Sequence, residues 1–385
     1  MLSEMLQEYG MEDVTVGRAV VGTLLLHIVW LRHNSLLPDL ARNAGRLALV
    51  VARLVMVILM LENLVSLLVL PAQVIHSTET ADGLAMKGWD ILNVSVPVSR
   101  GPAIHVSAGV FTPAEEPGHK GLTIILLPPN GASFEEFADF MIAYAKDAGA
   151  ERVVGINYRG VGQSEGGATC AKDLVDDAEA VIEYLIKERG YDEKLMLVHG
   201  WSLGGAVALQ LRQKRPHLLV VSDRSFRSLS AAAISMLEEP IPSGAVGLFA
   251  GFVAAFVLCG DSLKQFRFVS KWGGAALAIV FAIGGLKMLV PDALHLLKWE
   301  FDIQAPEVLY SSPLIVLFHR EDGIIAFDDV SLHQSLDLNQ PMVIPIEMEH
   351  VIVDNPAGSH MYVANSIESE WSLLIKAIHE NLPKA

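Results

Sequence analysis

The chain has 385 residues, enough for one large domain with additions or for two domains. Its formal net charge of −16 leaves no basic stripe to neutralise phosphates, which argues against nucleic acid as a partner. Hydrophobic residues make up 52% of the chain and the mean hydropathy is +0.40, which is high for a soluble enzyme and points to membrane contact or a very large core.

Two apolar segments come first, at residues 19–31 and 48–70. The first is only about 20 Å long as a helix, whereas the second can cross a hydrocarbon core about 30 Å thick. The second carries Arg53 and Glu62, but its many Leu, Ile and Val residues outweigh the cost of these charges. We therefore expect a transmembrane helix there, the alternative being an amphipathic helix packed on the domain. Residues 1–75 are predicted to form an N-terminal hydrophobic helical or membrane segment.

The first residues lack the basic region of a secretory signal, so we expect no cleaved signal peptide. The polar stretch 76–83 is interpreted as the linker into a second domain, residues 76–385. Residues 91–96 and 104–111 alternate apolar and polar side chains, which predicts half-buried antiparallel strands at a sheet edge.

From Leu122 onward, short apolar strands alternate with helices. The predicted strands cover 123–127, 152–158, 194–198, 218–222, 313–318 and 342–347, and the predicted helices cover 134–146, 173–188, 203–211, 328–336 and 368–382. Such alternation is typical of a parallel sheet covered on both faces. The predicted fold class is therefore α/β, with a doubly wound, mostly parallel sheet.

A long insertion, at about 229–305, interrupts this alternation. It contains two uncharged apolar segments, 244–259 and 273–286, which are about 21 to 24 Å long as helices and so are short for a membrane span. Small residues along both segments favour close helix–helix contact. Three interpretations stay open: a re-entrant or tilted membrane hairpin, a mobile lid over the active site, or buried core helices.

The stretch Gly200-Trp201-Ser202-Leu203-Gly204 lies between an apolar strand and a helix-forming run. A strand, a sharp turn and a helix are the context that a G-x-S-x-G nucleophile elbow requires. Such a turn holds the serine hydroxyl clear of the sheet. We therefore predict Ser202 as a catalytic nucleophile, the alternative being an ordinary strand-to-helix turn.

A serine hydroxyl needs a base to take its proton and a third group to orient that base. Around a nucleophile elbow the partners follow in the chain order serine, acid, histidine. Asp322 lies in the loop directly after the predicted strand 313–318, and we predict it as the acid. Glu321 beside it, and Asp223 after the preceding strand, are the alternatives.

Two histidines are candidates for the base. His360 follows a Gly-Ser turn just before the terminal helix, so it can swing over the top of the sheet. His350 lies between Glu349 and an apolar run, which suits a strand or an extra loop. We therefore predict His360 as the base, with His350 as the alternative.

The oxyanion hole needs two N–H donors aimed at the developing charge. We expect one from Leu203, directly after the nucleophile, and the other from the turn at Asn130.

The chain lacks an H-E-x-x-H motif, a P-loop and a cysteine–histidine zinc spacing, and its Gly160 and Gly162 do not complete a dinucleotide-binding motif. We expect no cofactor and no metal. The two cysteines do not define the redox compartment.

Residues from about 88 to 385 resemble the α/β-hydrolase superfamily, in its serine esterase and lipase-like branch. The elbow carries this resemblance together with the Glu321-Asp322-Gly323 loop and the stretch 157–164, which is similar to the R-G-x-G-x-S loop of that branch. The Pro128-Pro129-Asn130-Gly131 stretch departs from the His-Gly often found at the oxyanion loop. The resemblance implies a fold and a mechanism but no particular substrate.

The expected function is that of a membrane-associated serine hydrolase, which cleaves an ester or thioester of a lipid-like or acyl substrate through an acyl-enzyme. The alternatives are an inactive hydrolase-fold protein that binds or organises partners at a membrane, and an acyltransferase or peptidase with the same triad. The expected partners are an acyl ester or lipid-like small molecule and a membrane, which is also the expected location. If their flanking segments span, the basic links 32–46 and 260–271 should lie on the cytoplasmic side, with the catalytic domain opposite. The oligomeric state is left open.

Overall fold

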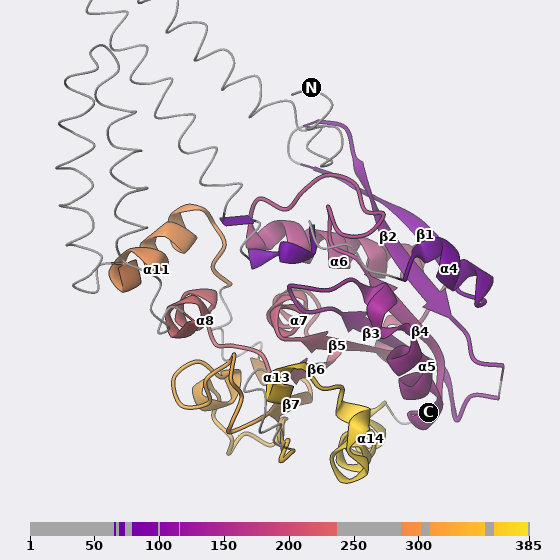
Figure 1. Ribbon diagram of the computed structural model, residues 1–385. Coiled ribbons are helices and arrows are strands. Elements are labelled where there is room, and N and C mark those ends of the chain that lie inside the picture. The colour runs from indigo at the N-terminus through magenta and orange to yellow at the C-terminus, as the bar shows by residue number, and fades with distance from the viewer. Residues whose placement is uncertain are drawn as a thin grey trace, which may run out of the picture. The chain divides into compact units, whose positions relative to one another are not determined.

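The computed structural model describes residues 65–66, 69–73, 79–98, 101–114, 116–236, 286–301, 309–350 and 358–383. The chain divides into two compact units, residues 1–65 with 237–293 and residues 66–236 with 294–385. Most of the first unit lies outside the described residues. The second unit contains the sheet and every candidate site residue (Figure 1).

An eight-stranded sheet forms the centre of the second unit, in the order β1-β2-β4-β3-β5-β6-β7-β8 (Figure 1). Its strands are β1 (Asp90–Val96), β2 (Ile104–Phe111), β3 (His119–Leu127), β4 (Ala150–Ile156), β5 (Met196–Trp201), β6 (Leu219–Asp223), β7 (Leu314–Phe318) and β8 (Val343–Glu347). β2 is antiparallel to β1 and to β4, and all other neighbours are parallel. The prediction of a mostly parallel sheet with antiparallel strands at one edge is confirmed.

Helices cover both faces of the sheet (Figure 1). The helices of the described residues, with 3₁₀ turns written η, are η2 (Pro71–Gln73), α4 (Ala81–Met86), η3 (Phe134–Phe137), α5 (Ala138–Asp147), α6 (Ala171–Lys187), η4 (Glu193–Leu195), α7 (Leu203–Lys214), α8 (Leu229–Met236), α11 (Leu286–Leu296), η6 (Leu332–Ser335), α13 (Gly358–Met361), η7 (Ala364–Ser366) and α14 (Glu368–Asn381).

One hydrophobic core lies under α5 and α14. The Trp371 ring of α14 is 4.9 Å from Tyr144 of α5, and Leu197 of β5 belongs to the same core. Because successive strand residues point to opposite faces, Val198 of β5 lies on the other face, which α6 and α7 cover. All residues of β5, β6 and β7 are buried, as expected for strands covered on both sides.

The helix predicted around residues 328–336 is replaced by the short η6. Backbone groups of this segment bond instead to the loop after β6: Leu332 N–H donates to Ser225 O at 2.9 Å, and Val330 O accepts from Arg227 N–H at 2.9 Å. Long-range bonds of this kind compete with the local bonds that a helix would make. The prediction of a helix at 328–336 is therefore wrong.

The stretch 76–83, interpreted as the linker into the second domain, ends in a helix. Residues 81–83 form the first turn of α4. The Thr80 side chain caps this helix, since its Oγ1 accepts from Gly83 N–H at 3.1 Å. Residues 76–78 lie outside the described residues.

The four apolar segments that predict membrane contact lie wholly or mostly outside the described residues. Of these segments the structure describes only four residues near the end of 48–70 and the last residue of 273–286. In the part of the chain that is described, no helix combines the length and the hydrophobicity needed to cross a bilayer. The hairpin, lid and core-helix interpretations of the insertion therefore stay predictions.

Candidate active site

Ser202 lies at the carboxyl end of β5, directly before α7. Its φ is +52° and its ψ is −114°, a backbone conformation that residues with side chains rarely adopt. Hydrogen bonds with β6 and with the loop after it hold this turn in place. Ser202 N–H donates to Asp223 O at 2.8 Å, and Ser202 O accepts from Ser225 Oγ at 2.8 Å. The predicted elbow geometry is therefore present.

Two glycines allow the turn to close. A Cβ on Gly200 would lie 2.1 Å from Gly204 O, and a Cβ on Gly204 would lie 2.1 Å from Leu127 O. No side chain fits at either distance. The absence of a Cβ thus lets the start of α7 pack directly on the end of β3, where the loop 128–131 begins.

The structure brings Asp322 and His360 together, although they lie 38 residues apart in the chain. His360 Nδ1 is 2.8 Å from Asp322 Oδ2, and the two side chains are only 3% and 2% exposed. The second carboxylate oxygen, Asp322 Oδ1, accepts from Ile324 N–H at 2.8 Å and from Ile325 N–H at 2.7 Å. Two backbone donors therefore hold the carboxylate in place, and the carboxylate orients the imidazole.

Trp201 connects this pair to the nucleophile turn. Its indole Nε1 donates to His360 O at 3.2 Å, and it directly precedes Ser202 in the chain. Ser202 follows β5 and Asp322 follows β7, so both lie at the carboxyl ends of parallel strands, the edge where ligands bind in open α/β sheets. Within the described residues, the Ser202 hydroxyl makes no hydrogen bond with His360. Catalytic hydrogen bonds often tighten only when substrate binds.

His350, the alternative base, does not contact Asp322. Its carbonyl accepts from His319 Nε2 at 2.8 Å, and its ring lies edge-on to Tyr362 at 5.4 Å. Its N–H donates to Glu370 Oε1 at 3.0 Å. These contacts give His350 a place in the packing between β8 and α14.

Glu321, one alternative acid, is exposed to solvent, and its N–H donates to His319 Nδ1 at 2.9 Å. It makes no contact with His360 in the described part of the chain.

Asp223, the other alternative acid, pairs with Arg224 and His199 instead of His360. Its Oδ1 is 2.6 Å from Arg224 Nε, and its Oδ2 is 3.0 Å from a terminal guanidinium nitrogen of Arg224 and 3.3 Å from His199 Nε2. Burial alone would raise the pKa of Asp223, but the Arg224 charge and the bonds from both partners outweigh it and hold this pKa well below its usual range. Asp223 is thus ionised at neutral pH.

The expected oxyanion donors lie beside the nucleophile. Leu203 is the first residue of α7, so its N–H has no partner within the helix. In the second donor loop, Asn130 O accepts from Ala72 N–H at 3.1 Å. Because the peptide is trans, this bond directs Gly131 N–H the opposite way. The roles of Leu203 and Asn130 stay predictions.

The sequence did not single out Arg224, His199 or Tyr144, which extend the buried network behind the nucleophile. His199 Nδ1 lies 3.1 Å from Tyr144 Oη, and its Nε2 contacts Asp223. A signal was available, since Asp223 and Arg224 form a charged pair directly at the end of an otherwise apolar strand.

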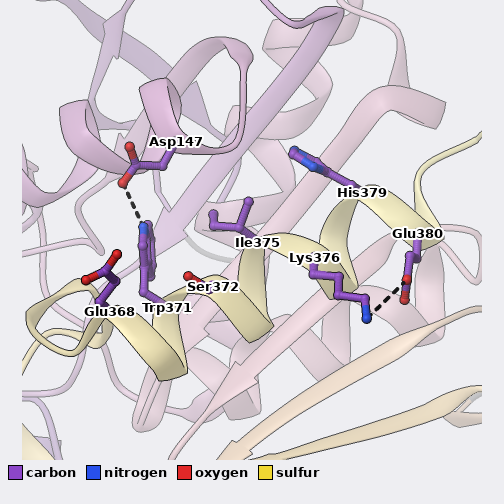
Figure 2. Close-up of a pocket in the computed structure, with 8 residues that line it drawn as sticks. All are labelled: Asp147, Glu368, Trp371, Ser372, Ile375, Lys376, His379 and Glu380. Atoms are coloured by element: carbon purple, nitrogen blue, oxygen red, sulfur yellow. Dashed lines mark hydrogen bonds and ion pairs between the residues drawn. The ribbon is translucent and has the colours of Figure 1, made fainter.

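A shallow hollow on the surface lies elsewhere, over α14 (Figure 2). Its lining includes Trp371, whose Nε1 donates to Asp147 Oδ2 at 2.7 Å, and a solvent-exposed Lys376–Glu380 pair at 3.8 Å. None of the predicted site residues lines it, so it takes no part in the chemistry considered for Ser202. Among the described residues, no cluster of three or more histidine, cysteine or acidic side chains could hold a metal ion.

Comparison with known proteins supports the fold. Residues 123–257 match the family described as alpha/beta hydrolase fold, and the predicted α/β-hydrolase fold is confirmed. A multifunctional-autoprocessing repeats-in-toxin protein of Vibrio cholerae is 33% identical over 135 residues, which are 34% of this chain and 3% of that protein. An uncharacterized membrane protein of Saccharomyces cerevisiae, YNL320W, is 30% identical over 109 residues, 28% of this chain and 38% of that protein.

The chain therefore spans only a small part of the first curated relatives that it matches. Among solved structures, an esterase of Pyrococcus furiosus is similar at 14% identity with a TM-score of 0.46, over 80% of this chain and 98% of that one.

Proposed function

We propose that this protein, which has the α/β-hydrolase fold, is a serine hydrolase that cleaves an ester or thioester through Ser202, His360 and Asp322. The observation that supports this most strongly is the buried 2.8 Å contact between His360 Nδ1 and Asp322 Oδ2. An imidazole oriented at Nδ1 by a carboxylate offers its Nε2 as a base. A strained turn carrying Ser202 lies beside the same segment, linked to it by Trp201.

In the proposed reaction, Ser202 Oγ attacks the acyl carbonyl carbon while His360 Nε2 takes the hydroxyl proton. Asp322 stabilises the imidazolium that forms. The N–H of Leu203 and a second donor from the loop at Asn130 bind the oxyanion. His360 then protonates the leaving alcohol or thiol, which leaves an acyl-enzyme. Water, deprotonated by His360, attacks this acyl-enzyme and releases the acid.

We further propose that the acyl group is lipid-like and that the protein works at a membrane. This part rests on the sequence: the apolar segments at 48–70, 244–259 and 273–286 and the mean hydropathy of +0.40. The Saccharomyces cerevisiae relative is itself named a membrane protein. Apolar segments in the same chain as a hydrolase fold suit a substrate that is drawn from a lipid surface.

A fluorophosphonate probe tests the nucleophile. It should label the wild-type protein and leave Ser202→Ala unlabelled, and equal labelling of both would reject the assignment. Hydrolysis of p-nitrophenyl esters of increasing chain length, with and without phospholipid vesicles, tests the substrate class. A preference for long chains that vesicles enhance supports a lipid-like substrate. A short-chain preference that vesicles do not alter leaves a serine esterase and rejects the lipid-like acyl group.

A further inference from the structure

A buried guanidinium lies behind the nucleophile turn. Arg224 follows β6, and its side chain is completely buried. Its φ of +44° lies in the left-handed region that favours glycine, while its N–H still donates to Leu317 O of β7 at 2.8 Å. A non-glycine residue stays in such a conformation only when its surroundings hold it there. The contacts of the Arg224 side chain therefore show which groups this conformation brings together.

Every side of the guanidinium has a partner. Its Nε and one terminal nitrogen form a fork on Asp223, at 2.6 and 3.0 Å. The other terminal nitrogen donates to Ser359 O at 3.2 Å and to Tyr362 O at 2.8 Å. The guanidinium carbon Cζ lies over the Trp201 ring and over the Tyr362 ring, 4.8 Å from each ring centroid. Arg224 therefore ties the end of β6 to the segment that carries His360.

That segment has little regular structure of its own. The helix α13, which contains His360, has only four residues, and the last carbonyls of a helix have no partner within it. Here Arg224 binds the carbonyls of Ser359 and Tyr362, on both sides of the histidine, while Trp201 binds the carbonyl of His360 itself. All three bonds come from the ends of β5 and β6.

We propose that Arg224 is a positioning residue that sets the place of His360 relative to Ser202, acting through the carbonyls of Ser359 and Tyr362. This inference rests on the proposed function. Asp223 supplies the counter-charge and aligns the guanidinium. A lysine could not replace Arg224, because a single ammonium cannot fork on a carboxylate and still reach two carbonyls.

A double-mutant cycle tests this role. Turnover of an activated p-nitrophenyl ester is measured for wild type, Arg224→Met, Arg224→Lys, His360→Ala and Arg224→Met/His360→Ala, each corrected for its folded fraction. We expect Arg224→Met to lower kcat about tenfold or more with KM little changed, since a small displacement of a catalytic group is costly. Arg224→Lys should recover only part of this loss. In the His360→Ala background the Arg224→Met loss should vanish, because no imidazole is left to position.

Arg159→Met is the matched control. Arg159 is also a buried guanidinium forked on a carboxylate, that of Asp177, and it contacts none of the described residues 358–362. Its effect on kcat should be the same with and without His360. If Arg224→Met also lowers kcat by equal factors in both backgrounds, Arg224 has a structural role only and the inference is overturned.

If Arg224→Met does not fold, Trp201→Phe takes its place, because it removes the indole N–H that donates to His360 O. A loss that disappears in the His360→Ala background supports positioning, and an equal loss in both backgrounds contradicts it. Failure of the proposed function is distinguishable, since it would appear as absent wild-type turnover or as probe labelling of Ser202→Ala. Normal wild-type turnover with equal losses rejects the role of Arg224 alone.

Discussion

The N–H of Ala72 donates to the carbonyl of Asn130 at 3.1 Å, across 58 residues of chain. Gln73 holds the same short segment in place, because its amide donates to Ser66 Oγ at 3.0 Å and its Oε1 accepts from Ala168 N–H at 3.2 Å. The turn η2 thus braces the loop expected to supply the second oxyanion donor.

We expect Ala72→Pro, which removes this N–H, to lower kcat by about 10-fold or more, since a loosely held donor stabilises the oxyanion poorly. Pro71→Ala is the control, because it keeps the N–H of Ala72. Steady-state hydrolysis of a soluble ester measures both variants. Unchanged kcat in Ala72→Pro would show that the brace has no part in catalysis.

Gly204 is required by its contact with the end of β3. A methyl group there would lie 2.1 Å from Leu127 O, and neither backbone can move without disturbing the elbow. We expect Gly204→Ala to lower the free energy of unfolding by about 3 kcal/mol or more. Gly131→Ala, where a methyl group would meet nothing within 4 Å, should change it by less than about 0.5 kcal/mol. Urea denaturation followed by circular dichroism compares the two, and similar losses would contradict the packing argument.

The sequence predicted the strands and the elbow well, because their patterns are local. A strand buried on both faces is mostly apolar, as β7 is throughout, and a turn as tight as Gly200–Gly204 needs glycines. The pairing of Asp322 with His360 was also within reach, since chain order and the carboxyl ends of strands restrict the candidates.

The contacts behind the site were not predictable in the same way. Arg224 meets Ser359 and Tyr362 across 135 and 138 residues of chain, and no local pattern encodes such a contact. The same reason explains η6. The helix predicted at 328–336 does not form there, because Leu332 N–H donates to Ser225 O in a distant loop. Long-range hydrogen bonds of buried groups decide both cases.

Acid should weaken the fold through Asp223. The pKa of Asp223 is lower in the folded protein than in the unfolded chain, where it is about 3.9. Its ionised form therefore stabilises the fold above the unfolded pKa, and this stabilisation is lost as the pH falls toward the folded pKa. Between pH 5 and pH 3 the loss from this one group should be about 1 kcal/mol.

Asp223→Asn measures this contribution. The variant should be less stable than the wild type at pH 7, because Arg224 keeps no counter-charge, and the difference in free energy of unfolding should shrink as the pH falls from 5 to 3. Urea titrations at each pH give both curves. A difference that is constant across this range would mean that Asp223 titrates alike in the folded and unfolded states.

The identity of the acid can be tested by comparing two neighbouring residues of one loop, Asp322 and Glu321. Asp322 is buried against His360 Nδ1, whereas Glu321 beside it is exposed. We expect Asp322→Asn to lower kcat by about 10³–10⁴-fold, because the amide no longer stabilises the imidazolium and favours the wrong tautomer. Glu321→Gln should leave kcat within about twofold of the wild type, as expected for an exposed side chain away from the reacting atoms. The rate of fluorophosphonate labelling provides a second readout, since it requires the same base and no substrate binding site. A large loss of kcat in Glu321→Gln, with Asp322→Asn still active, would assign the acid to Glu321. The buried contact between Asp322 and His360 would then be structural only.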